Sequence, residues 1–104
     1  MTTRPANEVI RQQLVRLRQD AVEARLNINR AMDVPAGFGT DVVQLFTIVG
    51  GLNFPSSARC KEYALSITGR PTAPWEIADV DRIIDRINDM LKEIESQEVQ
   101  ARQL

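Results

Sequence analysis

Two segments, one near each end of the chain, carry apolar residues at alternating spacings of three and four positions. The first segment contains Ile10, Leu14, Leu17, Ala21, Ala24, Ile28 and Ala31. The second contains Ile77, Val80, Ile84, Ile87, Leu91 and Ile94. Because an α-helix completes a turn every ~3.6 residues, each set forms one stripe that can pack lengthwise against another helix. The pattern predicts an all-α fold built on two long, heptad-patterned helices with coiled-coil packing.

Residues that cap or break helices divide the chain into four predicted helices. These cover about 7–32, 41–49, 55–68 and 72–97. Pro35 and Gly37 end the first helix, and Thr40 is the expected N-cap of the second. Segment 41–49 is also rich enough in β-branched residues for a strand, but we favour a helix because no second strand is evident to pair with it. We therefore expect two short helices between the two long ones.

The whole chain of 104 residues is expected to form a single helical domain. Its content of 43% apolar and 26% charged residues is typical of a folded protein. Disorder is expected only at the ends, over about 1–6 and 98–104. The longest apolar stretch, 42–49, is far shorter than a membrane span, and the first residues contain no secretory signal. Because Cys60 is the single cysteine and cannot form an internal disulfide, these features predict a cytoplasmic protein without membrane contact.

An antiparallel arrangement of the two long helices satisfies both apolar stripes at once. In one register the small Ala21 faces the large Ile87. Ala24 likewise faces Ile84, so that small and large side chains interdigitate. The remaining layers pair Leu14 with Ile94, Leu17 with Leu91, Ile28 with Val80 and Ala31 with Ile77, and the flanking positions pair Arg11 with Glu95, Arg18 with Asn88 and Arg25 with Asp81. The sequence leaves open whether this pairing forms within one chain or between two chains.

Further apolar side chains lie outside these stripes and need cover. They are Val15, Val22 and Leu26 on the first helix and Ile83 and Met90 on the last. The two short helices can cover part of this surface, and a second copy of the chain is a natural source of the rest. These five residues are therefore the expected oligomer or partner interface, with a two-fold dimer as the simplest assembly. The same assembly is expected to complete the helical bundle.

The first helix also carries an arginine at every seventh position, namely Arg4, Arg11, Arg18 and Arg25. This spacing puts all four on one side of the helix, where guanidinium groups could bind the phosphates of a nucleic acid or a nucleotide. The competing interpretation is pairing with the last helix. Residues 1–30 hold six arginines against three acids, whereas 72–104 hold eight acids against four bases. We favour pairing because the antiparallel register already supplies partners for three of the four arginines.

No group of residues predicts catalysis, a metal site or a cofactor. The chain contains no histidine, which excludes Ser-His-Asp and Cys-His chemistry and the commonest zinc ligand. Cys60 lies beside two basic residues that could lower the pKa of its thiol, but a buried structural cysteine is the more frequent case. The carboxylates of Asp81, Asp85 and Asp89 share one helix face, and we interpret them as a solvated surface rather than a metal site.

The sequence therefore favours a small, non-enzymatic protein–protein interaction module, such as an adaptor, an inhibitor or an assembly factor, acting as a homo-oligomer. Its expected partners are a second copy of itself and an unidentified protein. The alternative is a protein that binds nucleic acid or a phosphate-bearing ligand through the arginines of the first helix. No cofactor is expected in either case.

Overall fold

The computed structural model describes residues 3–68 and 75–103, and the side chains of residues 7–68 and 75–99. Within these residues there is no strand, and the helices are α1 (Thr3–Asn29), α2 (Phe38–Gly50), α3 (Ser57–Thr68) and α4 (Ile77–Gln103). Most of the described residues lie in these helices, so the predicted all-α class is confirmed. Segment 41–49, which the sequence left between helix and strand, lies inside α2.

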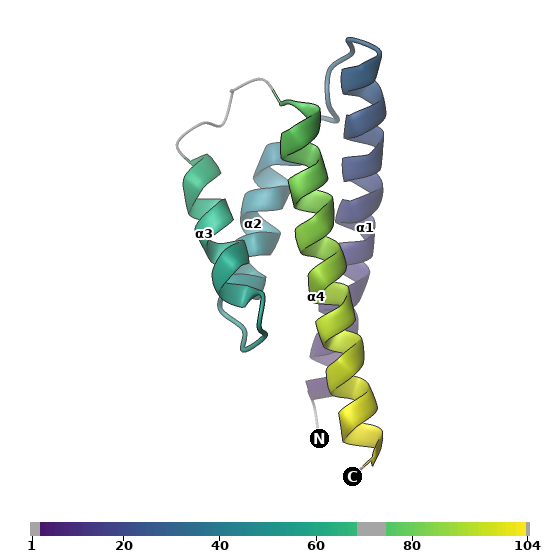
Figure 1. Cartoon of the computed structure of the whole chain (residues 1–104), viewed down its shortest axis with the longest axis vertical. Coiled ribbons are helices and arrows are strands. Elements are labelled where there is room, and N and C mark those ends of the chain that lie inside the picture. Colours follow the sequence, from purple (N-terminus) through teal and green to yellow (C-terminus); the bar gives the residue numbers. More distant parts are fainter. Residues whose placement is uncertain (1–2, 69–74, 104) are drawn as a thin grey trace.

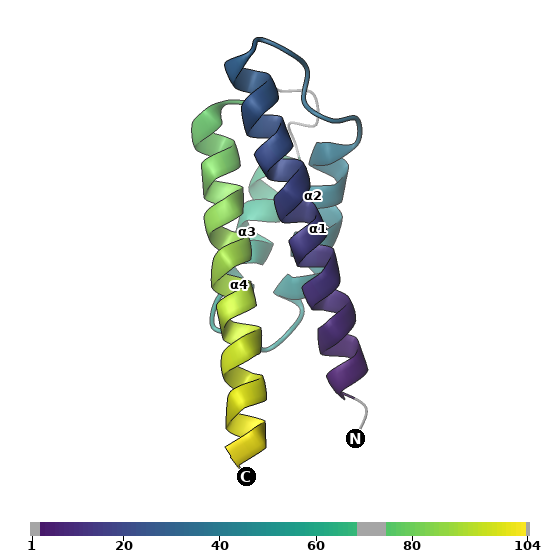
Figure 2. The ribbon, with the colours of Figure 1, turned by 90° about the vertical axis from the view of Figure 1, so that its right-hand side faces the viewer.

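The helices form two layers. The long helices α1 and α4 run antiparallel and side by side, so that α1 begins and α4 ends at the same end of the molecule (Figure 1). The short helices α2 and α3 pack on one another and together cover one side of this pair, with α2 against α1 and α3 against α4. Viewed from the side away from α2 and α3, the pair of long helices lies in front of the two short ones (Figure 2). The predicted antiparallel pairing therefore forms within one chain.

Both long helices extend further toward the chain ends than the sequence predicted. Helix α1 begins at Thr3 instead of Asn7, and α4 continues to Gln103 instead of ending near Gln97. The helical backbone thus enters both segments for which disorder was expected. Proline at position 5 is compatible with this start because the first turn of a helix has no intrahelical partners for its N–H groups. The residues after Gln97 are mostly good helix formers, without glycine or proline to stop the helix.

The C-terminal end of α1 is closed by a residue in the left-handed conformation. Ala31 has φ 56°, and the N–H of Met32 donates to the carbonyl of Asn27 at 2.7 Å, while the N–H of Ala31 donates to Ile28 at 3.1 Å. This pair of hydrogen bonds defines a Schellman motif, in which glycine is the usual left-handed residue. Ala31 therefore lies outside the helix and is exposed. The predicted layer of Ala31 with Ile77 is wrong, because the chain has already turned away at this level.

Helix α2 begins two residues before the predicted cap at Thr40. Gly37 occupies the N-cap position with φ 79°, a conformation that costs little only for glycine. The helix can therefore start at Phe38, which is buried and packs edge-on against Trp75 with ring centroids 5.2 Å apart. Thr40 is exposed and lies within the first turn. The left-handed Gly37 and the buried Phe38 thus mark the start of this helix.

A carboxylate of α4 fixes the start of α3. Glu93 accepts a hydrogen bond from the backbone N–H of Ser56 at 2.9 Å, and its second oxygen accepts one from the Ser56 hydroxyl. The negative charge therefore lies at the N-terminal end of α3, where the helix dipole favours it. The other end of the α2–α3 connection is close-packed, because a Cβ added at Gly50 would lie 2.6 Å from the Cβ of Lys61. These two contacts hold the short helices against each other and against α4.

The apolar stripe of α4 is turned further toward the short helices than the heptad pattern predicted. Its completely buried residues are Val80, Ile83, Ile87, Met90 and Ile94. Ile84 and Leu91, which the pattern placed in the core, are only partly buried. The expectation that Ile83 and Met90 face a partner is wrong, because both side chains belong to the core cluster that includes residues of α2 and α3. The two short helices thus bury apolar side chains of α4 that the sequence predicted to need a second copy of the chain.

Truncation of a residue that the short helices cover should be costly. We expect Ile83→Ala to lower the free energy of unfolding by about 2–5 kcal/mol, because the side chain is completely buried and its loss leaves a cavity. The control is Leu65→Ala on α3, where the leucine is 68% exposed, and the expected change there is within about 0.5 kcal/mol. Urea denaturation of both variants at one protein concentration measures this difference, and equal losses would contradict the assignment of Ile83 to the core.

The left-handed residue at the end of α1 offers a stabilising substitution. We expect Ala31→Gly to raise the free energy of unfolding by about 1 kcal/mol, because a β-carbon is strained at positive φ. The same change at Ala58, an exposed residue of α3, should instead lower stability by up to ~1 kcal/mol. Thermal denaturation followed by circular dichroism distinguishes the two signs, and a loss of stability at Ala31 would argue against the Schellman motif.

Candidate interaction surface

The side of the α1–α4 pair that faces away from α2 and α3 is called here the outer face (Figure 2). The hollow and the contacts described below, extended by helical spacing, assign to it Arg11, Val15, Arg18, Val22, Arg25 and Leu26 of α1 and Asp81, Ile84, Asn88, Leu91, Glu95, Glu98 and Val99 of α4. Most residues that the sequence singled out as an interface or as a phosphate site thus belong to one surface. It joins apolar side chains from both helices with a row of bases on α1 and acids on α4.

Two of the predicted contacts between the charged flanks are confirmed. The Nε of Arg25 donates to the Asp81 carboxylate at 2.8 Å, and Arg18 donates to the side-chain oxygen of Asn88 at 2.9 Å. Both contacts follow the register that the apolar layers predicted. They lie at different heights along the pair, so they fix how far one helix is displaced along the other. The solvent-exposed ion pair contributes little stability, about 0.2–1 kcal/mol for contacts of this type.

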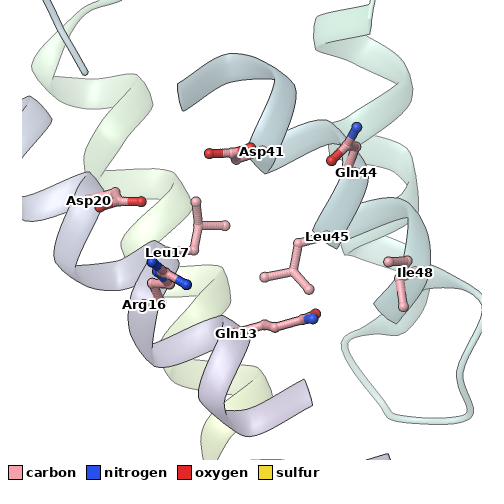
Figure 3. Close-up of a pocket in the computed structure, with 8 residues that line it drawn as sticks. All are labelled: Gln13, Arg16, Leu17, Asp20, Asp41, Gln44, Leu45 and Ile48. Atoms are coloured by element: carbon pink, nitrogen blue, oxygen red, sulfur yellow. The ribbon is translucent and has the colours of Figure 1, made fainter. Parts of the chain in front are cut away.

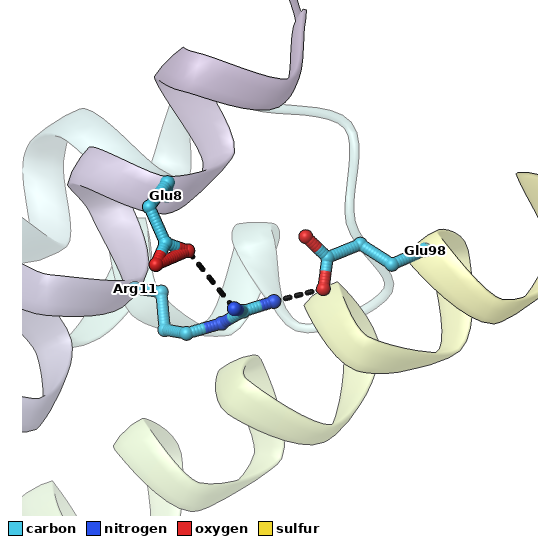
Figure 4. Close-up of polar contacts among 3 residues, drawn as sticks. All are labelled: Glu8, Arg11 and Glu98. Atoms are coloured by element: carbon cyan, nitrogen blue, oxygen red, sulfur yellow. Dashed lines mark hydrogen bonds and ion pairs between the residues drawn. The ribbon is translucent and has the colours of Figure 1, made fainter.

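Arg11, the third arginine of the row, does not contact its predicted partner. Arg11 donates to Glu98 on α4 and, at 2.9 Å, to Glu8 one turn before it on α1 (Figure 4). The predicted contact with Glu95 is wrong. Glu98 lies in the segment for which the sequence predicts disorder, and the continuation of α4 past Gln97 brings it to the level of Arg11. The helix-forming composition of residues 98–103 was the signal that could have identified it.

These contacts bear on the possible phosphate site. Of the four arginines proposed for phosphate, Arg11, Arg18 and Arg25 all bind side chains of α4. The side chain of Arg4 lies outside the described residues, although its backbone is part of α1. A phosphate would have to compete with carboxylates that are already in place for Arg11 and Arg25. The observed geometry therefore favours the pairing interpretation of this arginine row.

The apolar residues of the outer face are open to solvent. Val22 is 47% exposed and Leu26 is 48% exposed, while Val15, Ile84 and Leu91 are partly buried. Near the end of the pair, a hollow of about 480 Å³ is lined by Arg11, Val15, Arg18, Leu91, Glu95, Glu98 and Val99. Its lining thus combines apolar side chains with charges of both signs. Such a surface suits a protein partner with an apolar ridge and opposite flanking charges.

A second hollow of about 480 Å³ lies between α1 and α2. Its lining residues are Gln13, Arg16, Leu17, Asp20, Asp41, Gln44, Leu45 and Ile48. Figure 3 shows polar side chains of the two helices on opposite sides, with the buried Leu17 and Leu45 between them. Arg16 is the single base among two carboxylates, so the hollow has no excess of positive charge for an anion. Its residues were not identified from the sequence, since only the packing of α2 on α1 brings them together.

Cys60 and the acidic residues of α4 are the remaining chemical candidates of the sequence. Cys60 is completely buried, and burial raises the pKa of its thiol to about 11, which is the reverse of an activated nucleophile. Within residues 3–68 and 75–103, no three side chains of the His, Cys, Asp and Glu types are grouped as a metal site requires. In the same residues, no helix has the combined length and apolar character to span a membrane.

Comparison of the chain with protein-family models, curated proteins and solved structures finds no match. Inference about its function therefore rests on the contacts and exposure of its own residues. Among these, the outer face is the surface that carries most of the residues expected to bind a partner. The hollow between α1 and α2 has fewer features that point to a specific ligand.

The contact of Arg11 with Glu98 can be tested against its neighbour Glu95. We expect Arg11→Glu to lower stability, since it places a third carboxylate beside Glu8 and Glu98. Adding Glu98→Arg should restore most of the loss by exchanging the charges, whereas adding Glu95→Arg should restore less. A double-mutant cycle by urea denaturation measures both couplings, and we expect the first to be on the order of 0.5–1 kcal/mol. Equal rescue by the two changes would contradict the observed pairing.

Proposed function

We propose that this chain is a small, non-enzymatic helical protein–protein interaction module that acts as a homo-oligomer. The observation that carries the proposal is the outer face, where Val22 and Leu26 are about half exposed beside the partly buried Ile84 and Leu91. Exposed apolar side chains gathered on one face, rather than scattered singly, are typical of a surface that binds another protein. An adaptor, an inhibitor or an assembly factor would use the surface in this way.

The surrounding charges support the same function. Arg25 and Asp81 remain nearly half exposed although they contact each other, so each can also meet a group of a partner. Charges at the rim of an interface select partners and orientation more than they add affinity. We also propose a cytoplasmic location, for which the support is the single unpaired cysteine of the sequence.

Binding of nucleic acid or of a phosphate-bearing ligand is the weaker alternative. Its support was the row of arginines on α1, and the described members of that row are engaged with α4. A nucleic-acid ligand would bind less tightly as salt increases, because bound phosphates release counterions. Binding that falls steeply with salt in a filter assay, without self-association, would favour this alternative over the interaction module.

The proposal predicts that the chain self-associates and that the outer face is needed for it. We expect sedimentation equilibrium to give a mass above that of the 11.7 kDa monomer at high micromolar concentration. Leu26→Glu should weaken association by at least about tenfold, because it introduces a charge into an apolar contact worth on the order of 1.4 kcal/mol or more. Leu65→Glu on α3, where the leucine is 68% exposed, is the matched control and should leave association unchanged.

Two results would contradict the proposal. The first is a wild-type protein that stays monomeric at high micromolar concentration. The second is equal weakening by Leu26→Glu and Leu65→Glu, which would show that self-association does not depend on the outer face. Circular dichroism of both variants checks that the helices are intact.

A further inference from the structure

We infer that a second copy of the chain covers the outer face, related to the first by a two-fold axis that runs parallel to α1 and α4. In this dimer α1 of each protomer lies on α4 of its partner. The inference rests on the proposed homo-oligomeric function and adds to it the surface, the symmetry and the contacting residues. The product is a four-helix bundle with the short helices α2 and α3 on its two outer sides.

Symmetry limits the arrangements that can bring two outer faces together. For the long helices of two copies to pack lengthwise, a two-fold axis within the plane of contact must run either along the helices or across them. An axis along the helices places α1 on α4 of the partner. An axis across the helices instead places α1 on α1 and α4 on α4. The choice between the two depends on which side chains then face each other.

The charges of the outer face select the axis along the helices. Its bases, Arg11, Arg18 and Arg25, all belong to α1, and the acids Asp81, Glu95 and Glu98 belong to α4. Glu8 on α1 is paired with Arg11, so the outer face of α1 keeps an excess of positive charge. An axis across the helices would stack the bases of one protomer on those of its partner, and like charges in contact are strongly unfavourable at an interface. The axis along the helices instead brings the basic row of each protomer to the acidic row of its partner.

The apolar residues agree with this choice because of the register within each chain. The contacts of Arg18 with Asn88 and of Arg25 with Asp81 set which residues of α1 and α4 lie at the same height. By that register Val15 is level with Leu91, because Val15 lies three positions before Arg18 and Leu91 lies three positions after Asn88.

Val22 is level with Ile84 for the same reason, because Val22 lies four positions after Arg18 and Ile84 lies four positions before Asn88. Rotation about an axis parallel to the helices leaves every height unchanged. Val15 therefore meets the partner's Leu91, and Val22 meets the partner's Ile84. Val15 and Val22 of α1 thus obtain apolar contacts across the dimer, and Leu26 lies one turn further along the same face of α1.

The surface is also large enough for a stable dimer. Helix α1 has 27 residues and α4 has 27 residues, which at about 1.5 Å per residue makes each about 40 Å long. Two helices side by side are about 20 Å wide, so the outer face offers on the order of 800 Å². That is close to the ~800 Å² that each partner buries in a specific interface of standard size.

Disulfide trapping between two variants, each with one added cysteine, tests the inference. One protein carries Val22→Cys and the other carries Ile84→Cys, and the two are mixed and oxidised mildly. In the inferred dimer a Val22→Cys site meets the partner's Ile84→Cys site, which brings the two sulfurs within reach of a disulfide. Peptide mass spectrometry should find the mixed 22–84 disulfide, and either variant alone should give no linked dimer. The native Cys60 does not compete, because its thiol is buried and stays protonated near neutral pH.

The control for random collision is Leu65→Cys, an exposed position on α3, mixed with Ile84→Cys. The 22–84 product should exceed the 65–84 product by about tenfold or more, since the dimer holds the first pair at a high effective concentration. Yields equal to the control would overturn the inference. So would a 22–22 or 84–84 disulfide from one variant alone, which would indicate that like helices meet.

Sedimentation of the same mixtures, kept reduced, distinguishes failure of this geometry from failure of the proposed function. An oligomer without the 22–84 disulfide would overturn the two-fold arrangement and leave self-association standing. A monomer in every sample would overturn both. An oligomer that yields the 22–84 disulfide, and neither like-with-like disulfide, supports the inference.

Discussion

The structure depends on burying an apolar stripe of α4 that is wider than one neighbouring helix can cover. Helix α1 covers one flank of the stripe, and the α2–α3 layer covers the other. Val80, Ile83, Ile87, Met90 and Ile94 are thereby removed from water completely. At about 1.5–3 kcal/mol for each large side chain, this burial outweighs any single polar contact in the molecule. The short helices are therefore part of the core rather than a connection between the long ones.

Polar contacts place the helices once burial has brought them together. Glu93 holds the start of α3 through Ser56, and this fixes the short layer on α4. Arg18 and Arg25 reach Asn88 and Asp81, and these contacts fix the register of α1 along α4. Because such contacts exchange hydrogen bonds to water for hydrogen bonds within the protein, their net contribution is about 0.5–1.5 kcal/mol each. Their main consequence is that one arrangement is preferred among several that bury similar areas.

Features that repeat along a helix could be predicted from the sequence, and features that depend on contact with a distant segment could not. The periodic apolar and charged positions predicted two long antiparallel helices and the contacts of Arg18 and Arg25. They could not predict that α2 and α3 dock on the flank that holds Ile83 and Met90, because docking depends on Phe38 and the Ser56–Glu93 contact. The same limit hid the hollow between α1 and α2, whose residues come from separate helices.

The rotation of α4 toward the short helices also explains why an apolar surface remains. A heptad stripe centred on α1 would have buried Ile84 and Leu91 and left Ile83 and Met90 outside. The short helices reverse this outcome, so that Ile84 and Leu91 are partly exposed beside Val15 and Val22. Under the proposed function, a second copy of the chain covers Ile84 and Leu91, which the core of one chain leaves partly exposed. The internal register then has a second consequence, because the helix pair that folds the monomer also sets which residues would meet in the proposed dimer.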